Sequence, residues 1–278
     1  MKRHRQRPVK IDFFFRPGYY WTDEQLARYH TEMEQIASDC FLQVPRYQCL
    51  TGSREDLKNN VITFARDNDG NALGFCSAVI LDVGGYENIL HLGLSCVKKH
   101  ARQRGLTHYM ASRLLMKYLF KTSMFKTIWV TNVACVLSSL GNVALHFEDV
   151  FPSPYGSHTP SRDHIRIAQA VDRDFRQPVA INKTAELDLD HFVFRNSVHQ
   201  TVFQKSEKDT RYYHRDPELT QFYLSRMNFK NGDEIIQVAR IGILSYPKYR
   251  IKMAFLSLLN LVRIPRRRVK AGLFSRKG

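Results

Sequence analysis

The sequence predicts an α/β fold, in which helices flank a mixed, mostly antiparallel sheet. Between residues 60 and 97, three apolar runs rich in strand-forming residues are separated by turn residues. From Leu106 the apolar period lengthens to that of a helix. A short β-branched run follows at Thr127–Asn132. Strands followed by helices in this order are typical of an α/β sheet.

The first predicted helix covers residues 21–38. Thr22 is a suitable N-cap, because its hydroxyl can accept a bond from a free N–H group of the first turn. Asp23 and Glu24 follow in that turn, where negative charge is favoured by the helix dipole. Apolar residues then recur at helical spacing, at Leu26, Tyr29, Met33 and Ile36.

Three strands are predicted next, at Asn60–Arg66, Ala72–Val83 and Asn88–Val97. The Asp-Asn-Asp-Gly sequence between the first two is a strong hairpin signal, and a pair of glycines ends the second. The helix that begins at Leu106 has an apolar stripe on one face. The stripe consists of Tyr109, Met110, Leu114, Leu115, Tyr118 and Leu119.

The later elements have weaker patterns. Residues 133–146 and 162–175 are predicted to be helical, and residues 190–195 and 234–243 to be strands. A chain of 278 residues is long for one domain and short for two, so we expect one domain with extensions.

We divide the chain into four parts. Residues 1–16 are a basic N-terminal tail and residues 17–150 are the core. Residues 151–247 are a C-terminal extension with late strands, which could supply a lid. Residues 248–278 are a basic amphipathic tail.

The net charge of +16 is concentrated at the two ends of the chain. Residues 1–10 carry five basic side chains and residues 248–278 carry ten, with no acidic residue in either stretch. The remainder has 27 basic and 26 acidic residues and is close to neutral. Such cationic ends attract anionic polymers or lipid headgroups without reading a sequence.

Composition also restricts the compartment and the metal chemistry. The five cysteines are scattered and show no C-x-x-C spacing, which argues against zinc and a disulfide framework and favours a reducing cytoplasm. The basic start lacks the apolar region of a signal peptide, and no run is long enough for a membrane span. We expect a cytoplasmic protein without a metal, or one peripheral at the inner face of a membrane.

The stretch from Leu94 to Leu115 combines a strand, a basic turn with one glycine, and a helix start. A helix start leaves its first N–H groups without partners and carries about half a positive charge. Gly105 lets the backbone approach an anion closely, so a pyrophosphate can bind on the exposed amides. Lys98 and Arg104 add positive charge.

This stretch resembles the GNAT acetyltransferase superfamily, whose hallmark is R/Q-x-x-G-x-G/A after the fourth strand. Thr107 stands where the family has Gly or Ala. The resemblance covers about residues 21–152 and implies that the fourth and fifth strands splay apart. It further implies that acetyl-CoA, or another acyl-CoA, binds with its pantetheine arm between them. The residues that match the hallmark are Arg102, Gln103, Arg104, Gly105, Leu106 and Thr107.

The resemblance also implies roles for residues of the two splayed strands. The backbone of Cys96 and Val97 would pair with the pantetheine amides. Asn132 stands where the family has an Asn that contacts the cofactor arm; a helix N-cap is the alternative. Seven residues later, the family has a Tyr that protonates the leaving thiolate, and this sequence has Ser139.

Transfer of an acyl group to an amine needs positioning, deprotonation of the ammonium and stabilisation of the oxyanion. A base with a near-neutral pKa helps. His91 and Glu87, on or beside the fourth strand, are the candidates, and the alternative for His91 is a hydrogen-bonded structural residue. Cys96 and Cys135 are expected to be buried fillers, since a reactive thiolate needs a cationic, accessible setting.

Two other segments carry weaker signals. His158 and Asp163 fit the H-x-x-x-x-D pair of glycerolipid acyltransferases, but no glycine-rich phosphate motif with an Arg follows. Residues 246–268 are apolar at helical spacing with basic flanks, which fits a helix on an anionic membrane surface. A helix docked on the domain is the alternative, and nucleic-acid contact is the least expected.

We therefore predict an acyl-CoA-dependent N-acyltransferase with a small-molecule or protein amine as acceptor. The alternative is a noncatalytic acyl-CoA-binding or membrane-surface adaptor with the same fold, which Ser139 at the tyrosine position favours. The basic ends favour an anionic or membrane-associated acceptor over a polyamine.

Overall fold

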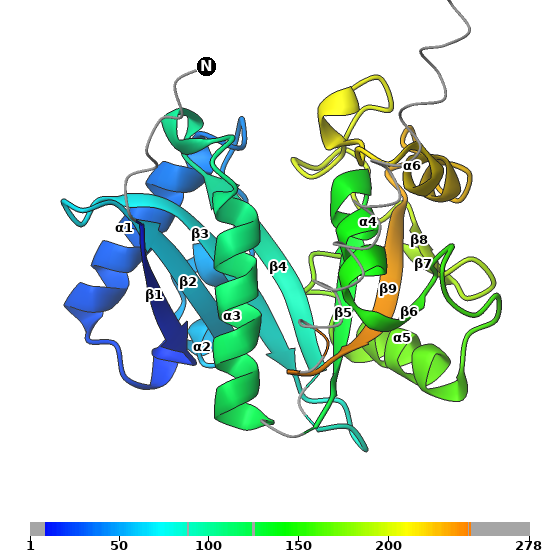
Figure 1. Ribbon diagram of the computed structural model, residues 1–278, viewed down its shortest axis with the longest axis horizontal. Helices are drawn as coiled ribbons and strands as arrows, with labels where there is room; N and C mark the ends of the chain where they lie inside the picture. Colours follow the sequence, from blue (N-terminus) through cyan, green and yellow to red (C-terminus); the bar gives the residue numbers. More distant parts are fainter. Residues whose placement is uncertain (1–8, 88, 124–125, 244, 246–278) are drawn as a thin grey trace, which may run out of the picture. The chain divides into compact units, whose positions relative to one another are not determined.

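The structure, a computed structural model, describes residues 9–87, 89–123, 126–243 and 245. Its described residues up to Ile243 belong to one compact unit (Figure 1). In chain order the helices and strands are β1 (Lys10–Phe15), α1 (Asp23–Ser38), α2 (Arg54–Leu57), β2 (Asn60–Arg66), β3 (Ala72–Leu81), β4 (Ile89–Val97), α3 (Leu106–Thr122), β5 (Ile128–Ala134), α4 (Leu137–His146), β6 (Glu148–Phe151), α5 (Arg162–Asp174), β7 (Glu186–Asp188), β8 (Val193–Arg195), α6 (Pro217–Leu224) and β9 (Glu234–Ile241).

The strands form one mixed sheet in the order β1-β2-β3-β4-β5-β9-β8-β7, and β6 pairs with β9 outside this path. Among the described strands, β4 and β5 are the one parallel pair. They pair only through Leu90 with Val130 and His91 with Thr131. Beyond these residues the two strands separate towards their C-terminal ends (Figure 1). The predicted mostly antiparallel sheet with splayed fourth and fifth strands is thereby confirmed for residues 60–134.

A bulge in β4 lies where the strands begin to separate. Cys76 pairs with Ser95 and Ala78 with Leu92, so Ser77 alone faces two residues of β4. Such a bulge bends its strand and increases the local twist. The Leu94 N–H donates to Ser77 Oγ at 3.1 Å, so this backbone group keeps a partner. We attribute the turning of β4 away from β5 to this bend.

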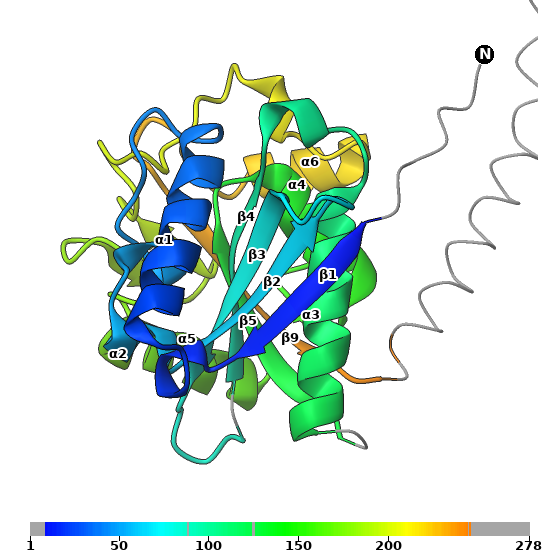
Figure 2. The ribbon, with the colours of Figure 1, turned by 90° about the vertical axis from the view of Figure 1, so that its left-hand side faces the viewer.

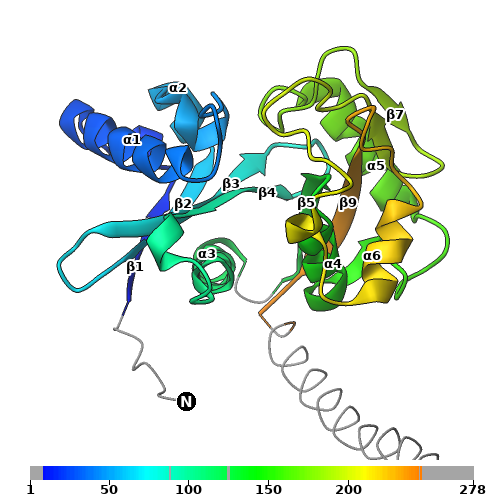
Figure 3. The ribbon, with the colours of Figure 1, turned by 90° about the horizontal axis from the view of Figure 1, so that it is seen from above.

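Helices cover both faces of the sheet (Figures 2 and 3). Helices α1 and α2 lie on one face of β1–β4, and α3 lies on the other. Across the splay, α5 covers the same face as α1, whereas α4 and α6 lie on the face of α3.

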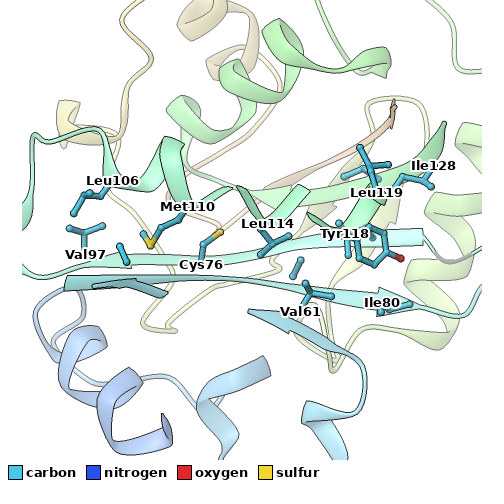
Figure 4. Packing of buried hydrophobic residues seen from close by; sticks show 14 of the residues in the cluster. Val61, Cys76, Ile80, Val97, Leu106, Met110, Leu114, Tyr118, Leu119 and Ile128 are labelled. Carbon is cyan, nitrogen blue, oxygen red and sulfur yellow. The ribbon is translucent and has the colours of Figure 1, made fainter. Parts of the chain in front are cut away.

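The apolar stripe of α3 packs against β1 to β4 (Figure 4). Met110, Leu114, Tyr118 and Leu119 are buried, as predicted. Tyr109 was placed in the same stripe, but its side chain is 38% exposed, and its ring lies under the Arg113 guanidinium instead. The buried stripe is thus narrower than the sequence suggested.

Helix α1 follows the sequence signals closely. Thr22 is its N-cap and accepts a bond from the Gln25 N–H, while the Gln25 side chain accepts the Thr22 N–H. This reciprocal pair is a capping box, which satisfies two N–H groups at once. The predicted N-cap is confirmed.

Strand β1 lies within the stretch that the sequence indicated as a basic tail. It pairs antiparallel with β2 over its whole length. Ile11, Phe13 and Phe15 pack against the α3 side of the sheet, and Phe14 packs with aromatic residues on the α1 side. The basic residues give this stretch its charge, whereas its alternating apolar residues decide its structure.

The later strands complete the sheet of the core. Strand β9 pairs antiparallel with all of β5, and β8 pairs with β9. A division of the chain at residue 150 would therefore cut one sheet. The predicted basic amphipathic tail at residues 248–278, with its membrane contact at 248–268, lies outside the described residues. In the part of the chain that is described, no helix is long and apolar enough to cross a membrane.

Candidate functional site

The turn between β4 and α3 leaves the start of the helix open. Gly105 is the N-cap with a φ of 69°, and within the described residues no side chain caps the helix. A Cβ added to Gly105 would meet no described atom within 4 Å. In this part of the structure the first-turn N–H groups thus have no N-cap side chain as acceptor, and together with the helix dipole they favour an anion.

The predicted phosphate-binding residues differ in their surroundings. Gln103, Gly105 and Thr107 are exposed, Arg104 is half-buried and Leu106 is buried beneath the helix start. Leu106 therefore anchors the helix, while the exposed residues border the open space.

Arg102 is held against protein backbone. Its Nε donates to the Val97 C=O at 3.2 Å, and its Nη2 donates to the Asp39 C=O at 2.5 Å. Nη2 also lies 3.7 Å from the Cys40 Sγ. The side chain thus ties the turn to β4 and to the end of α1, and it contributes to the site by positioning.

The strand register decides which backbone groups of β4 face the gap. The Lys98 N–H donates to the Leu73 C=O of β3 at 2.9 Å. Backbone groups alternate between the two sides of an antiparallel strand, so those of Cys96 also point towards β3. Those of Ser95 and Val97 point towards β5. Of the two residues predicted to pair with pantetheine, Val97 therefore has its N–H on the side of β5, while its C=O accepts the Arg102 Nε, and Cys96 has its backbone groups turned towards β3.

Asn132 is buried on the α4 face of β5. Its Nδ2 donates to Gln237 Oε1 at 3.0 Å, and Gln237 Nε2 donates to the Leu140 C=O at 3.2 Å and to Tyr223 Oη at 2.8 Å. This buried chain of amides ties β5 and β9 to α4 and α6. The N-cap of α4 is Val136, so the alternative of Asn132 as an N-cap is wrong.

His91 lies at the last pairing position of β4 with β5. It is buried, with Nδ1 3.0 Å from Thr131 Oγ1 and Nε2 3.5 Å from Tyr47 Oη. Burial lowers its pKa to about 3. At neutral pH the ring is therefore uncharged and a weak base, which fits the structural alternative for this residue.

Glu87 lies in the turn that precedes β4, beyond the end opposite to the α3 start. Its carboxylate pairs with Lys126 Nζ at 3.0 Å, and both side chains are more than two-thirds exposed. Strand β4 spans about 30 Å at 3.3 Å per residue. The structure thus does not bring Glu87 to the open helix start.

A buried carboxylate that was not singled out from the sequence lies beside the end of β5. Glu234 begins β9, where the next residue, Ile235, pairs with Ala134. It is 7% exposed, and Ser197 Oγ donates to its Oε2 at 2.6 Å. Burial raises its pKa to about 7, against the lowering effects of the Ser197 bond and of Lys205.

Glu234 belongs to a polar cluster on the α1 and α5 face of the sheet. Successive strand residues alternate between faces, and Ile235 packs with α4 and α6, which places Glu234 on the opposite face. The negative charge of Glu234 contributes to the raised pKa values of Tyr47 and Cys135. Two hydrogen-bonded groups thus lie on this face, Tyr47 with His91 and Thr131, and Ser197 with Glu234, and we refer to the two together as the polar cluster.

An aromatic contact beside this polar cluster joins the connection between α1 and α2 to the segment after β8. The Phe203 ring packs edge-on against Tyr47 at 5.4 Å and against Phe41 at 5.8 Å between ring centroids. Tyr47 and Phe41 belong to the connection between α1 and α2, whereas Phe203 follows β8. Within the described residues, no three His, Cys, Asp or Glu side chains are grouped to hold a metal.

The sequence matches no protein-family profile and no curated protein. One similar solved structure is an aminoglycoside N-acetyltransferase in complex with CoA, with 18% identity over 42% of this chain and 74% of that chain, and a TM-score of 0.30. Another is a ribosomal-protein-alanine N-acetyltransferase from Brucella melitensis, with 18% identity, 42% and 76% coverage, and a TM-score of 0.31.

A third similar structure, from Desulfovibrio desulfuricans, is assigned to the GNAT acetyltransferases. It shows 10% identity over 54% of this chain and 92% of that chain, with a TM-score of 0.36. The fold assignment rests on the chain's own topology, in which β4 parts from its parallel neighbour β5 and leads into an open helix start. The chain has the GNAT fold. The GNAT resemblance seen in the sequence is therefore confirmed at the level of the fold.

Proposed function

We propose that this GNAT-fold protein is an acyl-CoA-dependent N-acyltransferase with acetyl-CoA as the acyl donor. The observation that carries the proposal is the parting of β4 and β5 directly before an open, basic helix start. The pyrophosphate would bind to the first-turn amides after Gly105. The pantetheine arm would lie along β4, where the backbone of Ser95 and Val97 faces the gap.

The acceptor amine would approach from the face of the polar cluster. We propose Glu234 as the base that takes the ammonium proton, in place of His91 and Glu87. Its pKa of about 7 leaves a large fraction ionised at neutral pH and matches the strength that general base catalysis favours. The freed amine nitrogen then attacks the thioester carbonyl, and the C–S bond breaks as the amide forms.

The acceptor is proposed to be a small-molecule or protein amine. Two of the similar structures are named for acetylating amines, an aminoglycoside and an alanine of a ribosomal protein. The second candidate function is a noncatalytic acyl-CoA-binding adaptor. Ser139 at the usual tyrosine position favours it, as does the engagement of Asn132 with Gln237.

A transfer assay separates these two functions. Purified protein is incubated with acetyl-CoA and one amine at a time: an aminoglycoside, a peptide with N-terminal alanine, and spermine. Release of the free CoA thiol is followed. We expect at least one amine to raise the release above that with acetyl-CoA alone. Binding of acetyl-CoA without transfer to any amine would favour the adaptor.

A further inference from the structure

Two cysteines meet beside the turn between β4 and α3, outside the polar cluster. Cys40 follows α1 and Cys96 lies on β4. Both pack in the apolar cluster between α1 and the sheet, and Cys40 Sγ lies 3.6 Å from the C=O of Val97, the residue after Cys96. Cys96 is 1% exposed, whereas Cys40 is partly exposed. Of these two thiols, that of Cys40 is therefore the one open to a reagent in solution.

Two groups beside Cys40 act on its thiol in opposite directions: the Val97 C=O accepts the thiol proton at 3.6 Å, whereas a guanidinium favours the thiolate. Arg102 Nη2 lies 3.7 Å from the Cys40 Sγ. The bond from Cys96 is the largest cause that lowers the pKa of Cys40, to about 6, and the same contact raises the pKa of Cys96. The neighbouring carboxylate of Asp39 accepts the Lys99 N–H at 2.9 Å. One thiol of the pair is thus an anion at neutral pH, and the other is its proton-bearing partner.

We propose that Cys40 and Cys96 form a peroxide-reactive dithiol, with Cys40 as the attacking thiol and Cys96 as the resolving thiol. The Cys40 thiolate attacks one oxygen of hydrogen peroxide, the O–O bond breaks, and hydroxide leaves and takes up a proton. The sulfur is thereby oxidised to a sulfenic acid. Cys96 then loses its proton and attacks this sulfur, the S–O bond breaks, and a second water leaves. One peroxide is reduced to two waters as one disulfide forms.

The other three thiols serve as internal controls. Cys49, Cys76 and Cys135 are buried. Burial raises their pKa values to about 12, 11 and 12, respectively. They lack both the access and the thiolate that peroxide requires. A disulfide between Cys40 and Cys96 would tie the end of α1 to β4 next to Arg102, the residue that positions the turn before α3.

The test treats the full chain with hydrogen peroxide at pH 7, blocks free thiols and maps the products by mass spectrometry. We expect a Cys40–Cys96 disulfide that dithiothreitol reverses. In Cys96→Ser, Cys40 should stop at a sulfenic acid that dimedone traps, and Cys40→Ser should lose the reaction. Without peroxide, iodoacetamide at pH 7 should label Cys40 at least about tenfold faster than the other four thiols.

The proposal is overturned if peroxide leaves Cys40 reduced in the wild type. It is equally overturned if Cys40→Ser is oxidised as fast as the wild type, or if iodoacetamide labels Cys40 no faster than the other thiols. The labelling measurement needs no variant, so a variant that fails to fold leaves the test intact. None of these outcomes depends on acyl-CoA binding.

Discussion

Glu234→Gln is expected to lower kcat for acetyl transfer by about 10²–10⁴-fold, the usual contribution of a positioned general base. The amide has the shape of the carboxylate, and its oxygen can still accept the bond from Ser197. It cannot, however, take a proton from the acceptor. Affinity for acetyl-CoA should be unchanged, because the proposed cofactor contacts lie on β4 and at the start of α3. Steady-state kinetics together with calorimetric titration measures both quantities.

Glu87→Gln is the matched control, since the exposed Glu87 pairs with Lys126 beyond the other end of β4. It should leave kcat unchanged. The wild-type kcat should rise about tenfold between pH 6 and pH 8, as a base with a pKa of about 7 ionises. Glu234→Gln should lose this dependence. A loss of activity in Glu87→Gln with an active Glu234→Gln would contradict the assignment.

Glu234→Gln is also expected to change how the free energy of unfolding depends on pH. The folded pKa of Glu234, about 7, lies above its ordinary value of 4.5. Between these pH values the folded state keeps a proton that the unfolded chain has released, so stability falls as the pH rises. By pH 8 the free energy of unfolding is lower by about 3 kcal/mol than it is below pH 4.5. The variant should therefore be more stable than the wild type at pH 8, as measured by urea denaturation.

Asp233→Ala is expected to lower the free energy of unfolding by about 3–5 kcal/mol, because two backbone N–H groups and the Arg195 guanidinium lose their acceptor, at about 1–3 kcal/mol for each unsatisfied donor. Asp233 is 1% exposed. Its Oδ2 accepts bonds from Arg195 Nη1 at 2.8 Å and from the Asn228 N–H at 3.0 Å, and its Oδ1 accepts the Asn196 N–H at 3.2 Å. Urea denaturation at constant pH measures the change.

Asp174→Ala is the control for this second variant. Asp174 is also paired with an arginine, Arg173, but that pair is exposed, and exposed pairs contribute little. We expect no measurable change. Because Asp233 directly precedes Glu234, its loss should also displace the proposed base. Equal stabilities of the two variants would refute the structural role given to Asp233.

Elements with local signals could be predicted from the sequence. Helix α1 begins at a capping box whose two members, Thr22 and Gln25, are three residues apart. Strand β2 has the predicted bounds. Strand β1 could not be predicted in this way, because its pairing with β2 is decided by residues about fifty positions later. Its basic neighbours dominate the local composition.

In the candidate site, too, only the parts with a local sequence signal could be predicted. The open helix start was located because a glycine and basic residues lie next to one another in the sequence. Glu234 could not be found, since its raised pKa results from burial, and the chain segments that bury it, such as the one that carries Ser197, lie far away in the sequence. The partner of Asn132 is likewise Gln237, 105 residues later. An acidic residue at the head of an apolar strand is too common to be a signal.

The central claim is that acyl-CoA binds at the open start of α3. Calorimetric titration with acetyl-CoA and with free CoA tests it in the wild type, Gly105→Trp and Gly85→Trp, at moderate salt so that the basic ends do not mimic specific binding. Both glycines have a positive φ and open space around a Cβ, but Gly85 lies in the turn before β4. We predict micromolar binding in the wild type and Gly85→Trp and its loss in Gly105→Trp. No binding in the wild type, or equal binding in both variants, would contradict the claim.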